Sequence, residues 1–287
     1  MADKKAAKSK KKSTVSKKTT VEATATKTSQ YRAFLREYKR FTKSLKQTPI
    51  VGAIVAEFIG TFILTIAMLQ MQGSPLFVAF AFAGTIMIVG GISGAHLNPA
   101  ITIGAWVARR INTVFALGYI AAQMIGAALA WLVLDTFTKN AASATTSSSS
   151  LFQVGTIAEG KEWYIFLAEM LGVLILSLGV ATALRVIKKN KLNAAFTSGF
   201  ALMTALYAAM SLTTVLLTAQ GTTLSFLNPA IAIVANGLSG ISNSNLWPIA
   251  IFIIAPILGA IVGFLLQNFL HTQTDEAEEI CDCEACK

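Results

Sequence analysis

The sequence predicts an all-α membrane protein in which six transmembrane helices and two re-entrant half-helices form an inverted repeat. Three observations lead to this fold class. Of the 287 residues, 54% are hydrophobic and only 13% are charged, whereas a soluble domain carries about 25% charged residues. Six apolar stretches each reach the length of about 20 residues that a helix needs to cross a bilayer. The phrase Leu-Asn-Pro-Ala-Ile occurs twice, at residues 97–101 and 227–231.

Charge is concentrated at the two ends of the chain. Fifteen of the 24 Lys and Arg residues precede Pro49, and six of the 14 acidic residues follow His271. Residues 1–30 consist mainly of Lys, Ala, Ser and Thr, and we expect a disordered basic cytoplasmic tail because they offer almost nothing to bury. A solvated tail that sets the topology is the favoured interpretation, contact with anionic lipid is the alternative, and no nucleic acid partner is expected.

Residues 31–48 are predicted to form a basic amphipathic juxtamembrane segment, because apolar side chains fall on one helical face and basic ones surround it. The apolar positions are Tyr31, Phe34, Leu35, Tyr38, Phe41 and Leu45, and the basic positions are Arg32, Arg36, Lys39, Arg40 and Lys43. Two interpretations stay open. The segment either lies on the inner leaflet as an interfacial helix or extends the first span into the cytoplasm.

Residues 49–270 contain the six predicted spans. They lie at about 50–71, 75–93, 112–134, 163–187, 194–217 and 246–270. We expect no signal peptide, since the first apolar run begins at Ile50 and is long enough to stay as a membrane helix. Basic residues gather in the N-terminal tail, before the third span, and between the fourth and fifth spans. By the positive-inside rule, both termini are cytoplasmic, in a multi-pass protein of the plasma (inner) membrane.

The two halves of the chain follow one plan, with repeats at about 49–134 and 163–270. Each repeated phrase starts an apolar stretch that is too short to cross, at about 98–108 and 228–237. Asn can cap a helix and Pro fits its first turn, so each phrase predicts the N-terminus of a half-helix. Each half has three spans, an odd number, so the second half is inverted. The half-helices therefore enter from opposite faces and meet near the midplane.

The meeting point has predictable properties. A helix N-terminus carries roughly half a positive charge, so two such ends disfavour a cation between them. The side-chain amides of Asn98 and Asn228 can donate hydrogen bonds to a passing oxygen. A water molecule held by two donors is oriented, and this orientation interrupts a proton wire. The arrangement favours a pathway for neutral molecules.

Four segments carry a resemblance to a known family. They are AEFIGTF at 56–62, SGAHLNPA at 93–100, YIAAQMIGA at 119–127 and APILGAIVG at 255–263. They resemble the aquaporin and glycerol-facilitator family, also called the major intrinsic protein family. The resemblance covers about residues 48–270 and implies an aquaporin-like channel domain. It also implies a passive channel in the lipid bilayer, generally a homotetramer with one pore per subunit, with no cofactor and no enzymatic activity.

The resemblance also implies roles for individual residues. The residues implied to line the central constriction are Asn98, Pro99, Ala100, Asn228, Pro229 and Ala230. Glu57 and Glu169 occupy equivalent Ala-Glu-x-x-Gly phrases of two spans. A buried membrane carboxylate is costly and needs partners, and in the family these carboxylates accept loop hydrogen bonds and brace the half-helices. His96 would border the inner pore mouth.

The sequence departs from the family at the outer selectivity filter, where the family places an arginine directly after the second Asn-Pro-Ala. The filter positions are predicted at Val78, Leu216, Ser225 and Ile231. Ile231 stands at the arginine position, whereas its counterpart Ile101 is expected to be an ordinary packing residue. Phe226 would supply an aromatic wall if the register slips by one. Losing the arginine removes a charge that repels cations, yet aliphatic side chains cannot replace hydration and so penalise ions strongly.

These observations predict a passive transmembrane channel for water or small uncharged solutes such as glycerol-like polyols, urea or ammonia. The alternatives are a membrane scaffold with a closed or vestigial pore, and a leaky ion channel. Residues 271–287 are predicted to form an acidic, cysteine-rich cytoplasmic tail. Cys281, Cys283 and Cys286 are weak candidate zinc ligands, because a structural zinc site needs four ligands and the tail supplies three.

Overall fold

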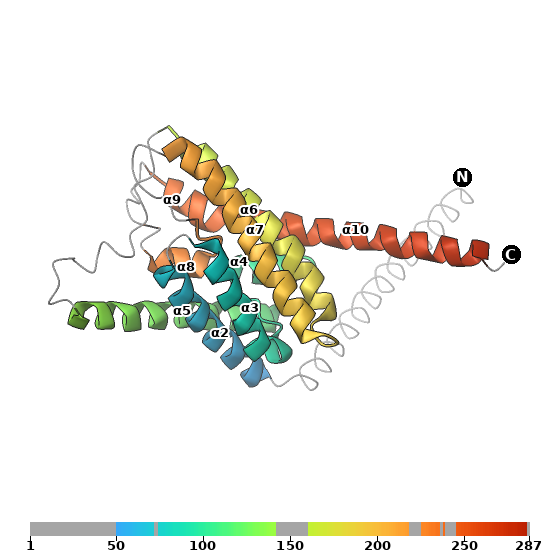
Figure 1. Cartoon of the computed structure of the whole chain (residues 1–287), viewed down its shortest axis with the longest axis horizontal. Helices are drawn as coiled ribbons and strands as arrows, with labels where there is room; N and C mark the ends of the chain where they lie inside the picture. Colours follow the sequence, from blue (N-terminus) through green and yellow to red (C-terminus); the bar gives the residue numbers. More distant parts are fainter. Residues whose placement is uncertain are drawn as a thin grey trace, which may run out of the picture. The chain divides into compact units, whose positions relative to one another are not determined.

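The structure is built from helices (Figure 1). The computed structural model describes residues 50–71, 74–141, 160–217, 225–235, 238 and 245–285. The elements are α2 (Ile50–Gln70), α3 (Pro75–Ser93), α4 (Pro99–Val107), α5 (Thr113–Ala141), α6 (Glu162–Val186), α7 (Lys191–Leu217), α8 (Pro229–Val234), α9 (Trp247–Ile249), the π-helical turn η2 (Ala250–Ile254) and α10 (Ala255–Ala285). The predicted basic tail and amphipathic segment, residues 1–48, lie outside the described residues and stay predictions.

Six of the described helices are long and apolar enough to cross a membrane, which confirms the six predicted spans. Their spanning segments are Ile50–Gln70, Pro75–Ser93, Thr113–Lys139, Glu162–Val186, Lys191–Thr214 and Trp247–Thr272. Helix α5 runs farther than predicted, to Ala141. Hydropathy detects only the apolar part of a helix, whereas the polar end of α5 is supported by an ion pair one turn apart, with Lys139 Nζ at 2.6 Å from Asp135 Oδ2.

Two short helices begin at the repeated phrase. Asn98 caps α4 and Asn228 caps α8, and in each case the side-chain oxygen accepts a hydrogen bond from the backbone N–H two residues on, at 2.8 and 3.1 Å. Proline occupies the first turn of both helices, where no backbone N–H is needed. Helix α4 closely matches its predicted range, whereas α8 ends at Val234. Residues 236–237, which complete the predicted second half-helix, lie outside the described residues.

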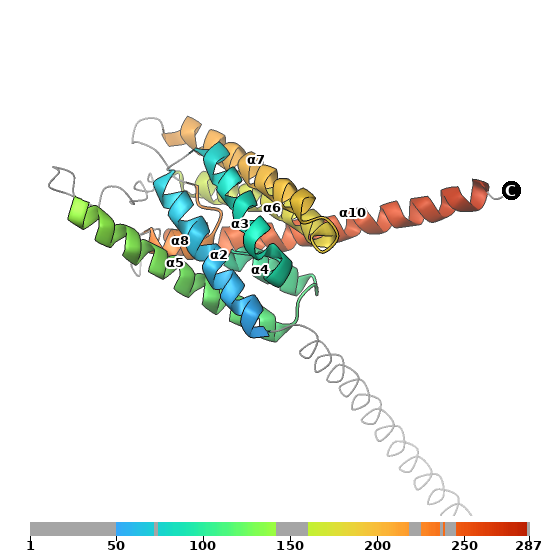
Figure 2. The ribbon, with the colours of Figure 1, turned by 60° about the horizontal axis from the view of Figure 1, so that its bottom comes forward.

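The two halves pack in the same way (Figure 2). Helix α5 lies against α2, and α10 lies against α6 in the other half. Glycine makes both contacts close, because a Cβ at Gly126 would collide with the backbone oxygen of Phe58, and one at Gly259 would collide with that of Met170. Phe58 and Met170 each directly follow the Glu of the Ala-Glu-x-x-Gly phrase, so the internal repeat extends to the helix contacts.

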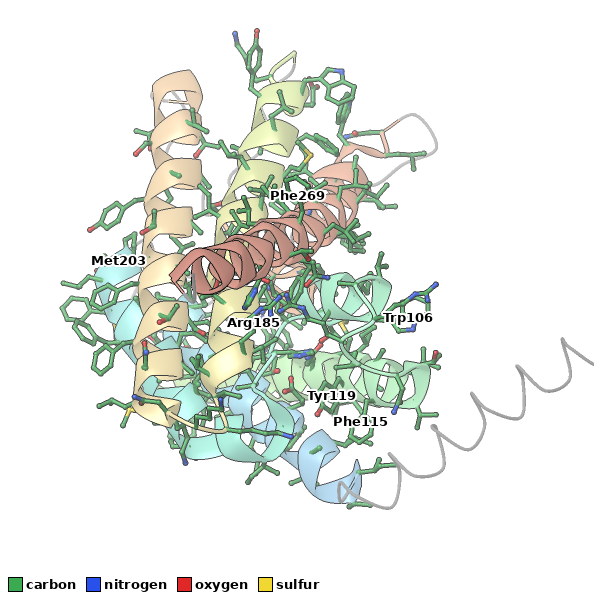
Figure 3. The ribbon with its side chains drawn as sticks, turned by 90° about the vertical axis from the view of Figure 1, so that its right-hand side faces the viewer. Trp106, Phe115, Tyr119, Arg185, Met203 and Phe269 are labelled. Carbon is green, nitrogen blue, oxygen red and sulfur yellow. The ribbon has the colours of Figure 1, made fainter. Side chains whose placement is uncertain are left out.

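A half-buried arginine ties the turn after α4 to the second half of the chain. Arg110 donates through Nη1 to the backbone oxygen of Ala181 on α6, at 2.6 Å. It also donates to the side-chain oxygens of Gln267 and Asn268 on α10. Burial, together with the nearby charge of Arg185, lowers the pKa of Arg110 to about 10, so it stays charged at neutral pH. Figure 3 shows Arg185 beside α10, where its Nε donates to Gln267 at 3.3 Å.

Helix α10 extends through most of the predicted C-terminal tail, to Ala285. The backbone of Cys281 and Cys283 belongs to this helix. Their side chains, and the whole of Cys286, are outside the described part of the chain. Within the side chains that are described, no group of three or more His, Cys, Asp or Glu residues could hold a metal ion. The weak zinc prediction is therefore untested.

Candidate functional site

The N-termini of α4 and α8 are joined head to head by a reciprocal pair of hydrogen bonds. Asn98 Nδ2 donates to the backbone oxygen of Leu227 at 2.7 Å, and Asn228 Nδ2 donates to that of Leu97 at 2.9 Å. Leu97 and Leu227 both have a φ of 53°, in the left-handed region that a branched side chain rarely adopts. The same unusual backbone therefore appears at both copies, and it turns each carbonyl toward the opposite asparagine.

Glu57, fully buried in the middle of α2, holds the first of these loops. Its Oε1 accepts from Ser93 Oγ at 2.6 Å and from the backbone N–H of His96 at 2.9 Å. Its Oε2 accepts from the backbone N–H of Leu97 at 2.7 Å and from Gln123 Nε2 at 2.7 Å. Hydrogen bonds to a charged acceptor are stronger than neutral ones. Four donors from three elements thus converge on one carboxylate.

Glu169 holds the second loop from the equivalent place on α6. Its Oε1 accepts from Ser225 Oγ at 2.6 Å and from the backbone N–H of Phe226 at 3.1 Å. Its Oε2 accepts from the backbone N–H of Leu227 at 3.0 Å. His96 and Phe226 therefore occupy equivalent positions in the two loops, since each donates its backbone N–H to the carboxylate of its own half.

Glycine completes the support on both sides. A Cβ at Gly60 of α2 would collide with the side chain of Leu97, and a Cβ at Gly172 of α6 would collide with that of Leu227. Each leucine is fully buried. The Ala-Glu-x-x-Gly phrase thus supplies both an acceptor for the loop backbone and the space for the loop side chain, and the i to i+3 spacing of Glu and Gly puts the two on neighbouring turns of one helix face.

A polar network extends from His96 into the helix bundle. His96 Nδ1 lies 3.3 Å from Thr102 Oγ1, and Thr102 Oγ1 donates to the backbone oxygen of Asn98 at 3.0 Å. Gln123 Nε2 donates both to Thr102 Oγ1, at 2.9 Å, and to Glu57. The imidazole of His96 is therefore connected to the carboxylate that holds its own backbone.

Tyr119 packs against the other side of the same histidine. Its ring meets the His96 ring edge to face, with centroids 5.4 Å apart, and its hydroxyl donates to the backbone oxygen of Ser93 at 2.8 Å. Phe115 packs edge to face against Tyr119 in turn, and Figure 3 shows the two side by side on α5. The loop before α4 is thus enclosed by aromatic rings as well as hydrogen bonds.

A narrow central cavity lies where the two half-helices meet. Its lining residues are Leu64, Met68, Phe82, His96, Asn98, Ile101, Leu176, Leu202, Phe226, Leu227, Asn228 and Ile231. The asparagines of the two Asn-Pro-Ala (NPA) triplets, Asn98 and Asn228, line it. The Pro and Ala residues of the triplets form the buried first turns behind them: Pro99, Ala100, Pro229 and Ala230. Ile101 lines this cavity, as Ile231 does, and both isoleucines are almost fully buried. The repeat places Ile101 and Ile231 at equivalent positions. Only Ile231 corresponds to the family's arginine position, so the sequence drew attention to Ile231 alone.

A second narrow cavity lies where α2 ends and α3 begins. Its lining residues are Met68, Ser74, Pro75, Val78, Leu206, Met210, Ser225 and Phe226. Two of the predicted filter residues, Val78 and Ser225, line this cavity, whereas Ile231 lines the central one. The backbone of Leu216 lies in α7, but its side chain is outside the described residues. The filter role of these four positions stays a prediction.

Sequence reasoning missed several residues of the site. Gln123 and Thr102 carry the polar network, and Met68 lies on the wall of both cavities. Gln123 offered a signal, since a glutamine in the middle of an apolar span needs a partner. Met68 offered none, because nothing local distinguishes a cavity-lining methionine from a lipid-facing one.

Comparisons with known proteins agree with this architecture. The sequence profile of the family described as major intrinsic protein matches residues 42–160. The glycerol uptake facilitator protein-like 6 of Lactiplantibacillus plantarum is 32% identical over 228 residues, which are 76% of this chain and 98% of the relative. The aquaporin AqpM of Methanothermobacter thermautotrophicus is 29% identical over 200 residues, which are 68% of this chain and 74% of the relative.

A solved structure shares the fold. The aquaglyceroporin from Plasmodium falciparum superposes with a TM-score of 0.61 at 20% sequence identity, covering 75% of this chain and 94% of its own. Together with six spanning helices and the paired half-helices, the full-length match to a curated relative identifies the architecture. The chain is an integral multi-pass membrane protein that belongs to the major intrinsic protein family of aquaporin and glycerol-facilitator channels.

Proposed function

We propose that the protein is a passive channel through which water and small uncharged solutes cross the membrane along their gradients. The observation that carries the proposal is the central cavity, which both NPA asparagines line. Each asparagine uses its side-chain oxygen for a helix cap and one amide hydrogen for the opposite loop. An amide nitrogen has two hydrogens, so each Asn keeps one donor for a passing oxygen.

The chemistry of the walls supports neutral cargo. No Asp, Glu, Lys or Arg is among the described residues that line the two cavities. An ion that leaves water without a compensating charge or hydrogen bonds meets a very large desolvation cost. The carboxylates of Glu57 and Glu169 face the loop backbones, where their acceptors are already used. We therefore assign them to bracing the half-helices and not to proton transfer.

The cargo class follows from the family and from the filter. Relatives are named as a glycerol uptake facilitator and as aquaporins, so water, glycerol-like polyols, urea and ammonia are the candidates. Ile231 replaces a donor at the arginine position, which weakens orientation of polyols. We place the protein in the plasma membrane with cytoplasmic termini, because of its basic loops. We expect a homotetramer, because the family generally assembles as tetramers.

One experiment tests the proposal. Purified protein in liposomes is followed by stopped-flow light scattering under water, glycerol and urea gradients, with a proton-sensitive dye in parallel. We expect water or solute rates above those of empty vesicles and no dye response. Rates equal to those of empty vesicles would favour a scaffold with a closed pore, and a fast dye response would favour an ion leak. In the variant Ile231→Arg, we expect reduced passage of the bulkier solutes.

A further inference from the structure

The two cavities share two wall residues. Met68, near the end of α2, and Phe226, in the loop before α8, line both the central cavity and the second cavity, and no other described residue does. These two side chains therefore lie where the two cavities adjoin, and a solute that moved directly from one cavity to the other would pass them. We call this pair the Met68–Phe226 neck.

The ring of Phe226 is held in place from two sides. Its backbone N–H is fixed by Glu169 at 3.1 Å. Its ring packs edge to face against Phe252, with centroids 5.9 Å apart, and both residues are buried. Phe252 lies in η2, the π-helical turn at the start of the last span. π-Helical turns inside helices are rare and are frequent at functional sites, and here the turn supplies the support of the neck.

The neck is apolar, whereas the wall of each cavity carries two or three polar side chains. The second cavity offers Ser74 and Ser225, and the hydroxyl of Ser225 already donates to Glu169. The central cavity offers His96 and the two NPA asparagines. Phe226 and Met68 offer no hydrogen-bond donor at all, because a phenyl ring has none and a thioether sulfur is only a weak acceptor.

The internal repeat shows that only the loop before α8 carries an apolar side chain at this position. His96 is the counterpart of Phe226 and reaches the same cavity from the opposite loop, held by Glu57 as Phe226 is held by Glu169. A solute beside His96 meets an imidazole that can exchange hydrogen bonds. Beside Phe226, the two described side chains of the neck, the phenyl ring and the Met68 thioether, offer no hydrogen-bond donor. The desolvation step of the pathway is therefore at the neck.

We infer that the Met68–Phe226 neck, and not the Ile231 position, discriminates among solutes, and that it favours small neutral molecules with few hydrogen-bonding groups. The inference rests on the proposed channel function. A hydroxyl that crosses the neck gives up a hydrogen bond to water, since no wall group replaces it. Among solutes of equal carbon skeleton, the one with fewer hydroxyls then crosses faster.

Glycerol and 1,2-propanediol test this directly, because they share a three-carbon skeleton and differ by one hydroxyl. After subtraction of empty-vesicle rates, we expect propanediol to cross about tenfold faster than glycerol, equivalent to about 1.4 kcal/mol for one lost hydrogen bond. In Phe226→Ala, water can accompany the solute and the ratio should fall toward unity. Met68→Ala opens the same neck from α2 and should act in the same direction. Phe77→Ala, an exposed ring on α3, is the control that should keep the wild-type ratio.

The outcomes separate the neck from the channel function. If the wild type conducts but the ratio is insensitive to Phe226→Ala and Met68→Ala in monodisperse protein, the neck is refuted and the channel stands. A ratio that responds to Ile231→Ala alone also refutes the neck. If only Phe226→Ala and Met68→Ala conduct, the proposed function of the native chain is refuted. The neck is then supported as the constriction that closes the native pore. If no variant conducts, both proposals fail.

Discussion

The two bracing carboxylates should differ in how well they tolerate loss of charge. Each oxygen of Glu57 accepts one backbone N–H and one side-chain donor. Glu169 differs because its Oε2 accepts only the backbone N–H of Leu227 in the described structure. A glutamine replaces one oxygen with an NH₂ group, which cannot accept. In Glu169→Gln, the NH₂ group can take the Oε2 place and displace one hydrogen bond, whereas Glu57→Gln displaces two in either orientation.

The size of the difference follows from the cost of an unsatisfied buried donor, about 1–3 kcal/mol each. Glu169→Gln should lose about 1–3 kcal/mol, and Glu57→Gln about 2–6 kcal/mol. For a protein of roughly this size, 1 kcal/mol shifts the melting temperature by about 2–4 °C. We therefore expect Glu57→Gln to melt several degrees below Glu169→Gln.

The assay is thermal unfolding in detergent at one fixed heating rate, because irreversible melting depends on the rate. Glu162→Gln serves as the control, since Glu162 has the same chemistry at the first turn of α6 and accepts none of the loop bonds. It should change the melting temperature little. The reasoning is wrong if Glu169→Gln melts at or below the temperature of Glu57→Gln, or if the control falls as far as either.

Three further predictions concern packing and capping, and all are read by the same melting assay. Gly259→Ala places a methyl group against a backbone oxygen and should cost about 1–3 kcal/mol, whereas Gly84→Ala, with nothing within 4 Å of its Cβ, should be neutral or stabilising; equal effects would refute the packing argument. Arg110→Gln should lower the melting temperature because it breaks the tie between α4 and α10, and the exposed Arg109→Asn should not; a harmless Arg110→Gln would refute the tie. Asn98→Ala removes both a helix cap and a cross-loop bond, so it should cost about 1–3 kcal/mol and also slow solute passage; unchanged passage in folded protein would remove this residue from the pathway.

The spans and half-helices could be predicted from sequence because their signals are local. Twenty apolar residues in a row have few alternatives to a membrane helix, and Asn-Pro is both a cap and a first turn. The equivalence of Glu57 and Glu169 was also visible, because the Ala-Glu-x-x-Gly phrase occurs in both halves. Each of these features can be recognised from residues within one helical turn or from a comparison of the two repeats.

The walls of the cavities could not be predicted in the same way. Met68 and Phe226 come to line the same cavities only after α2 and the loop before α8 have packed, and Arg110 binds Asn268, which is 158 positions away in the chain. The π-helical turn that supports Phe252 has no distinct sequence signal. The place of Ile101 on the cavity wall could not be predicted either, because the cavity belongs to both halves. Such contacts depend on tertiary packing, which a local pattern does not contain.

The internal repeat shows that the bonds that hold the two loops in place are distinct from the side chains that would discriminate among solutes. Both loops are held by the same backbone bonds to a buried glutamate and by the same asparagine–leucine cross-links. A scaffold that is symmetric in this way would present two equivalent approaches to the central cavity. At this position the approaches differ in the side chain that the scaffold carries, an imidazole at His96 and a phenyl ring at Phe226. Since neither side chain makes the bracing bonds, exchanging the Phe226 ring should alter solute ranking with little change in the loop, whereas neutralising Glu57 or Glu169 should lower stability first.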